Sequence, residues 1–89
     1  MELDDLRCFA KVAELASFTR AAEHLGLAKG RVSSAVQRLE QRLGTRLLLR
    51  TTRTVRLTPD GEAFVERCRD LLDDAEQLQT LFQPDARGL

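Results

Sequence analysis

Residues 17–43 read SFTRAAEHLGLAKGRVSSAVQRLEQRL, and this stretch decides the fold. Ser17 is a good helix N-cap, Gly26 is a good helix stop, and the apolar residues between them lie on one helical face: Phe18, Ala21, Ala22 and Leu25. A second amphipathic helix is predicted over about 29–43 from the spacing of Val32, Val36, Leu39 and Leu43. Two short helices joined by a tight turn are typical of a helix-turn-helix, here at about 18–37.

The flanking segments complete a small domain. Leu3, Leu6, Ala10 and Ala13 predict a first helix over about 3–15. After Gly44 the helical period stops, and two short apolar or β-branched runs at 47–49 and 54–57 indicate a β-hairpin. Thr58 and Pro59 then begin a long helix that extends to about residue 82.

The predicted fold class is therefore mainly α. We expect a winged helix-turn-helix over 1–58, made of three helices and a two-stranded β-hairpin wing. A long dimerisation helix follows over 59–82, and we expect a frayed tail over 83–89.

Composition excludes several classes of protein. No stretch approaches the roughly 18 apolar residues of a membrane span, and the acidic N-terminus lacks the apolar core of a secretory signal. Cys8 and Cys68 form no C-x-x-C motif, His24 stands alone, and no P-loop or H-E-x-x-H motif occurs. We expect a cytoplasmic protein that is not an enzyme and has no metal site, no cofactor and no membrane partner.

The formal net charge is zero, but the charges are sorted along the chain. Residues 28–58 hold eight basic residues against one acidic residue, Glu40, a net charge of +7, whereas residues 1–27 carry −2 and residues 59–89 carry −5. This asymmetry favours a local surface that binds a polyanion. The alternative is a basic face that is merely solvated.

The helix at 29–43 has an outward face that suits the DNA major groove. The residues of this face are small, basic or hydrogen-bonding, and no acidic residue occurs in the first ten residues of the helix. The face can therefore approach base edges and phosphates. The candidate contacts are Lys29, Gly30, Arg31, Ser33, Ser34, Gln37 and Arg38.

The hairpin carries a second set of candidate DNA contacts, because arginine and threonine at a hairpin tip suit phosphates or a narrow minor groove. These residues are Arg50, Thr51, Thr52, Arg53 and Arg56. A charged edge that prevents strand aggregation is the alternative interpretation.

The last helix carries an apolar seam with the four-three spacing of a coiled coil. Its members, the predicted dimer interface, are Phe64, Cys68, Leu71, Ala75, Leu78 and Phe82. Packing on the chain's own core can explain Phe64 but not Leu78 and Phe82, which lie far out on an acidic helix. A second copy of the chain is the simplest partner. A protein-interaction module that uses this seam without nucleic acid is the rival function.

The sequence resembles the opening of the LysR-type transcriptional regulators over residues 1 to about 82. The resemblance rests on a combination of motifs: Leu6-Arg7, Phe9, Val12-Ala13, Ser17–Ala22, Leu25-Gly26, Val32-Ser33, Arg38–Glu40, Leu43-Gly44, Arg46-Leu47, Arg50 and Leu57–Glu62. It implies a bacterial DNA-binding domain, associated with the nucleoid, that dimerises through its last helix and binds an interrupted inverted repeat. It also implies contacts from Thr19 and Arg20, and a tetramer in a full-length parent.

Family members usually carry a further domain that senses a small molecule. We expect that domain, and with it any inducer site, to be absent from this chain. The family usually begins its recognition helix with Ser-Gln-Pro or Ser-Gln-Ser, whereas Ala28-Lys29-Gly30 stands here. Ala28 cannot supply a side-chain cap, and Lys29 replaces an amide that often reads a base. The base preference of the family is therefore not carried over to this chain.

Overall fold

The computed structural model describes residues 1–82, and its elements lie close to their predicted positions. Helices α1 (Leu3–Leu15), α2 (Phe18–Leu25) and α3 (Lys29–Leu43) have the predicted bounds. Gly26 and Gly44 end α2 and α3 in the left-handed conformation that glycine adopts readily, with φ values of 69° and 70°. The prediction of a mainly helical winged helix-turn-helix is confirmed, and the predicted tail at 83–89 lies outside the described residues.

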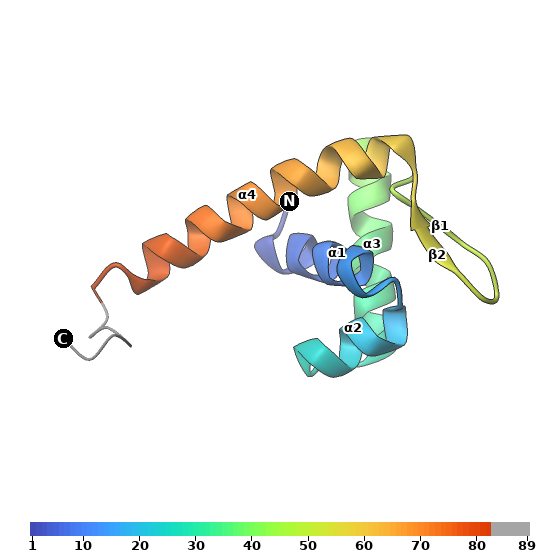
Figure 1. Ribbon diagram of the computed structural model, residues 1–89, viewed down its shortest axis with the longest axis horizontal. Helices are drawn as coiled ribbons and strands as arrows, with labels where there is room; N and C mark the ends of the chain where they lie inside the picture. The colour runs from blue at the N-terminus through green and yellow to red at the C-terminus, as the bar shows by residue number, and fades with distance from the viewer. Residues whose placement is uncertain (83–89) are drawn as a thin grey trace.

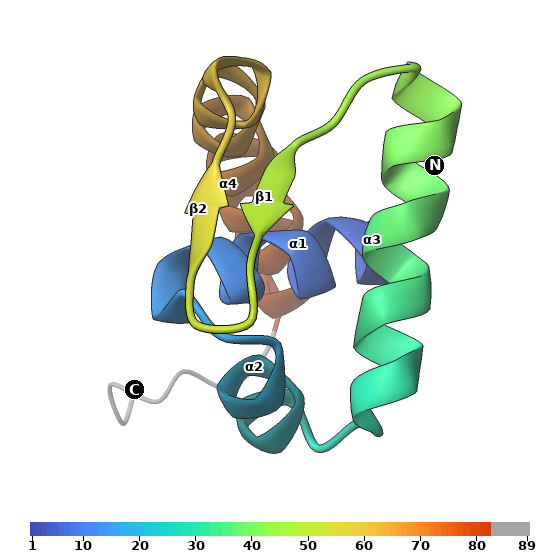
Figure 2. The same ribbon diagram turned by 90° about the vertical axis from the view of Figure 1, so that its right-hand side faces the viewer.

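The three N-terminal helices enclose the core. Figure 2 shows α3 along one side of the molecule, with α1 crossing it near its middle and α2 near its first turns. The largest side chains that are fully buried come from α1, α3 and the segment after α3: Phe9, Val12, Val32, Leu39 and Leu47. Burial of such a side chain contributes about 1.5–3 kcal/mol to stability, so these contacts fix α3 relative to the other helices.

The wing is an antiparallel hairpin of β1 (Leu48–Arg50) and β2 (Val55–Leu57). Leu48 pairs with Leu57, and Arg50 pairs with Val55 at the start of the loop. Each strand begins one residue later than its predicted run at 47–49 or 54–57. The N–H of Leu47 donates to the Glu40 side chain, and its carbonyl accepts the Thr58 N–H just beyond the second strand.

Helix α4 (Pro59–Thr80) begins at the predicted Thr58 cap and ends two residues before the predicted end. Figure 1 shows its first half lying over α1 and its second half extending away from the other helices. Phe64 packs on Phe9 with ring centroids 5.7 Å apart, and Cys68 donates through its thiol to the Leu6 carbonyl at 3.5 Å.

These contacts correct part of the predicted dimer interface. Cys68 is only 3 % exposed, and burial raises the pKa of its thiol to about 11. It belongs to the core of its own chain, and the half-buried Phe64 packs against the same core. None of the helices described within residues 1–82, α4 included, is long and apolar enough to cross a membrane.

Candidate nucleic-acid interface

Helix α3 begins without a side-chain cap, as the sequence predicted. Ala28 occupies the N-cap position with an extended backbone and offers no side-chain acceptor. Its carbonyl accepts the N–H groups of Arg31 and Val32 at 3.0 and 3.2 Å. The N–H groups of Lys29 and Gly30 precede the first intrahelical bonds, and both residues are exposed. The start of α3 therefore presents unpaired backbone donors and a lysine ammonium on one surface.

The outward face of α3 continues from this start along the helix. Ser34 and Gln37 are exposed and Ser33 is half-buried, whereas Val32 and Val36 point into the core. The structure thus brings together most of the predicted contacts of α3 on a single face. On the neighbouring α2, Thr19 and Arg20 are exposed as well.

Arg38 has a role that the sequence did not reveal. Its guanidinium donates from Nε and Nη2 to the two carboxylate oxygens of Asp5 at 3.2 and 2.8 Å. The Asp5 side chain is 9 % exposed, and its hydrogen bonds and charge raise the pKa of Arg38 above the ordinary value. Arg38, a candidate DNA contact, therefore also neutralises a nearly buried carboxylate.

The wing presents its basic residues outward. Thr52, Arg53 and Arg56 are exposed. The Thr51 hydroxyl accepts hydrogen bonds from the backbone N–H groups of Arg53 and Thr54 at 3.1 and 3.0 Å. Thr51 therefore shapes the loop that displays Arg53, instead of offering its hydroxyl freely.

Arg50 lies apart from the wing tip. Its Cζ is 4.2 Å from the centroid of the Phe18 ring in α2. An open groove of about 510 Å³ between α3 and β1 is lined by Ser33, Gln37 and Arg50 among others. The wing and the outward face of α3 thus meet in one groove.

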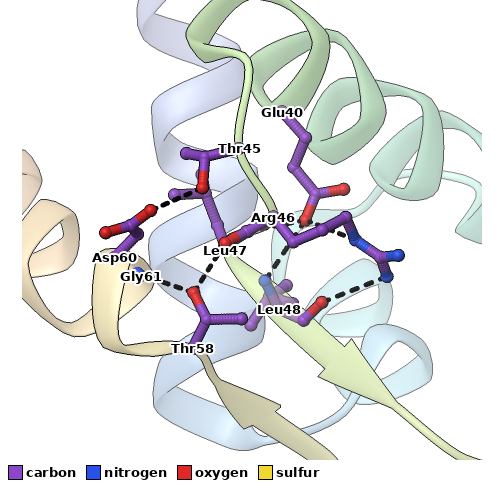
Figure 3. Close-up of polar contacts among 8 residues, drawn as sticks. All are labelled: Glu40, Thr45, Arg46, Leu47, Leu48, Thr58, Asp60 and Gly61. Carbon is purple, nitrogen blue, oxygen red and sulfur yellow. Dashed lines mark hydrogen bonds and ion pairs between the residues drawn. The ribbon is translucent and has the colours of Figure 1, made fainter.

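Glu40 ties the end of α3 to the first strand of the wing (Figure 3). Its Oε2 accepts the backbone N–H groups of Leu47 and Leu48 at 2.8 and 3.2 Å. Arg46 places Nε 3.5 Å from the same oxygen. The single acidic residue of the +7 segment is therefore a structural acceptor that fixes where the wing leaves α3.

Thr58 fixes the other end of the wing (Figure 3). Its hydroxyl donates to the Arg46 carbonyl at 2.6 Å and accepts the Gly61 N–H at 2.9 Å, so it caps α4 and holds the start of the wing at once. Gly61 is required here because a Cβ atom would lie 2.0 Å from the Leu47 carbonyl oxygen. These contacts give a physical reason for the motif Leu57–Glu62.

Sequence reasoning missed Asp5, Phe18 and Glu40 as residues that shape the interface. Glu40 carried a signal, since it is the single acid in a basic segment. Asp5 carried a weaker one, because an acid in the first turn of a helix is explained by the helix dipole alone. Nothing in the spacing of Phe18 distinguishes it from an ordinary core residue.

The far half of α4 exposes apolar side chains beyond the core. Leu71 is 49 % exposed, Leu78 73 % and Phe82 93 %, whereas Ala75 is half-buried. Within residues 1–82 no group of His, Cys, Asp and Glu side chains forms a candidate metal site.

The chain is similar in sequence to known transcriptional regulators. Residues 3–62 match the family model described as bacterial regulatory helix-turn-helix protein, lysR family. The HTH-type transcriptional regulator BudR of Raoultella terrigena is 52 % identical over 91 residues, which cover 100 % of this chain and 31 % of that protein. The uncharacterised HTH-type transcriptional regulator YhjC of Escherichia coli is 50 % identical over 84 residues, which cover 94 % of this chain and 28 % of that protein.

The crystal structure of a BenM DNA-binding domain in complex with catB site 1 DNA superposes with a TM-score of 0.87 at 41 % identity, covering 91 % of each chain. The chain spans about a third or less of the two curated regulators. The chain belongs to the lysR family of bacterial regulatory helix-turn-helix proteins.

Proposed function

We propose that this chain binds double-stranded DNA in a sequence-specific manner, as the DNA-binding part of a bacterial transcription regulator that works at the nucleoid. The observation that carries the proposal is the acid-free outward face at the start of α3, which continues through an open groove to the wing. A face of this kind fits the major groove, and the wing then lies along the neighbouring phosphates or minor groove. The similar BenM domain was crystallised as a DNA complex, which supports the same function here.

The DNA contacts divide by position. The residues on the outward face of α3 reach base edges in the major groove. These are Lys29, Gly30, Ser33, Ser34 and Gln37. The basic and hydroxyl groups around this face hold phosphates: Thr19, Arg20, Arg31, Arg50, Thr52, Arg53 and Arg56. Arg38 contributes at most its remaining N–H donors, because Asp5 occupies the other two.

We propose a homodimer that forms through the far half of α4, with residues 1–58 as the DNA-binding unit and 59–82 as the linker. Leu71, Ala75, Leu78 and Phe82 remain from the predicted seam as candidate interface residues, since they lie beyond the chain's own core. A two-fold dimer presents two α3 helices and so matches an inverted repeat. A full-length parent forms a tetramer of such chains.

The salt dependence of binding tests the DNA proposal against the rival protein-interaction module. If a dimer neutralises about six to ten phosphates, affinity falls by about 10³–10⁵ between 50 and 200 mM salt. Fluorescence anisotropy with a labelled duplex of mixed sequence measures this fall. A flat salt response, or no binding at low salt, contradicts DNA binding and leaves the protein-interaction module.

Sedimentation tests the dimer independently. Leu78→Asp places a charge within the exposed seam and is expected to shift the chain to monomer, because an unpaired charge is costly in a protein interface. Gln79→Asp is the matched control, since it adds the same charge to a neighbouring exposed position. Equal masses for the parent, Leu78→Asp and Gln79→Asp would contradict the role of this seam.

A further inference from the structure

The Arg50 side chain is held by an aromatic ring rather than by an acid. Its Cζ lies 4.2 Å from the centroid of Phe18. Within residues 1–82 no hydrogen bond or ion pair engages the guanidinium. The face of a phenyl ring attracts a cation through its quadrupole and offers no lone pair. The N–H donors of Arg50 therefore stay available for a ligand while its charge is kept in place.

Phe18 is a fixed platform for this contact. It is the first residue of α2, it is 6 % exposed, and the residue before it caps the helix by accepting the Arg20 N–H at 3.0 Å. The cap fixes the backbone at this helix start, and burial within the core confines the ring. A long arginine side chain on the wing is thus anchored to the body of the helix-turn-helix.

The anchored guanidinium stands beside the outward face of α3. Phe18, Ser33, Gln37 and Arg50 all line the groove between α3 and β1. The other arginine that lines this groove, Arg46, is paired with Glu40 at 3.5 Å. Arg50 is consequently the groove arginine whose charge no carboxylate neutralises among the described residues.

We infer that Phe18 is a positioning residue for DNA binding, which acts by holding Arg50 against a phosphate next to the bases that α3 reads. Arg50 then belongs to the surface of α3 and not to the wing tip, although it lies on the wing in sequence. This inference rests on the proposed DNA binding. It explains why an aromatic side chain is useful at a position where any large apolar residue would fill the core.

A double-mutant cycle tests the inference with the 89-residue chain and a labelled DNA duplex of mixed sequence. Arg50→Ala is expected to weaken binding about tenfold or more, because a charge-assisted hydrogen bond is lost. Phe18→Leu is expected to weaken it about two- to fivefold, the fold-change that corresponds to an exposed cation–π contact. In the Arg50→Ala background Phe18→Leu is expected to have no further effect, and Phe18→Tyr is expected to bind like the parent.

Two controls separate positioning from general loosening of the core. Phe18→Met removes the ring but keeps most of the packing, so it serves if Phe18→Leu unfolds. Phe9→Leu removes a core ring that contacts Phe64 and does not line the groove that holds Arg50. All variants are compared below their melting temperatures.

Four results would overturn the inference while leaving DNA binding intact. These are parent-like binding by Arg50→Ala, an equal loss from Phe18→Leu in both backgrounds, a loss in Phe18→Tyr equal to that in Phe18→Leu, and an equal loss in Phe9→Leu. Failure of the parent itself to bind any duplex would instead contradict the proposed function.

Discussion

The Asp5 carboxylate and the Arg38 guanidinium form a two-point pair that joins α1 to α3, with Nη2 2.8 Å from Oδ1 and Nε 3.2 Å from Oδ2. Asp5 is the third residue of α1 and its side chain is only 9 % exposed, so Arg38 is the cation that compensates its desolvation. The helix that faces DNA is therefore held by a charge pair in addition to apolar packing. Both the stability of the domain and the placement of α3 therefore depend on Arg38.

We expect Arg38→Ala to lower the melting temperature by about 4–8 °C or more, because it leaves a nearly buried carboxylate without its partner. Removal of both side chains in Asp5→Ala with Arg38→Ala is expected to cost less than Arg38→Ala alone. Arg42→Ala is the control, since Arg42 is exposed on the same helix and surface changes have small effects. Thermal unfolding followed by circular dichroism checks all four proteins, and equal melting temperatures for Arg38→Ala and Arg42→Ala would contradict the role of the pair.

Substitution of glycine by alanine is expected to change the unfolding free energy in opposite directions at Gly61 and Gly30. At Gly61 a Cβ atom would lie 2.0 Å from the Leu47 carbonyl oxygen, so Gly61→Ala is expected to cost about 1–3 kcal/mol or more of unfolding free energy. At Gly30 such a Cβ would meet no atom within 4 Å beyond its chain neighbours and the backbone of its own helix. Gly30→Ala is therefore expected to raise the unfolding free energy by about 0.5–1 kcal/mol, because alanine loses less backbone entropy on folding. Urea denaturation measures both values. A Gly61→Ala protein as stable as the parent would show that α4 does not pack against Leu47 as described.

The missing cap of α3 can be supplied. Ala28 has the extended backbone of an N-cap residue, and Ser17 shows in the same chain what a serine does there, accepting the Arg20 N–H at 3.0 Å. We expect Ala28→Ser to raise the unfolding free energy by about 0.5–2 kcal/mol, and Ser17→Ala to lower it by a similar amount. Chemical denaturation of the two variants provides the comparison. No gain from Ala28→Ser would indicate that water already satisfies the N–H groups at this helix start.

The helices and the capped start of α4 could be predicted because their signals are local. Ser17, Gly26 and the Thr58-Pro59 pair mark helix ends within a few residues of sequence, whatever the tertiary packing. The pair between Asp5 and Arg38 could not be predicted in this way, because the two residues lie 33 positions apart and each has an ordinary local explanation.

The apolar seam of α4 shows a second limit of prediction from sequence. A four-three spacing places side chains on one face of a helix, but it does not say whether the chain's own core or a second copy covers them. Cys68 and Leu78 therefore looked equivalent in sequence, although the first is buried and the second is 73 % exposed. The difference depends on which part of α4 lies against α1, and that is a tertiary property.

Lys29 lies at the start of α3, where its ammonium can donate to guanine O6 or N7. We expect Lys29→Gln to change the preferred base at one position in each half-site, with a discrimination of about 1–3 kcal/mol. Binding sites selected from random DNA by the variant and by the parent give the comparison. Identical sites would limit Lys29 to phosphate contact.

The same selection performed with the parent chain tests sequence-specific binding by a pair of α3 helices most directly. The predicted result is an enriched inverted repeat whose half-sites are centred about 10–10.5 base pairs apart or a multiple of that, as two symmetric recognition helices require. Recovery of sequences no different from the starting pool, at a salt concentration where the chain binds DNA, would contradict it.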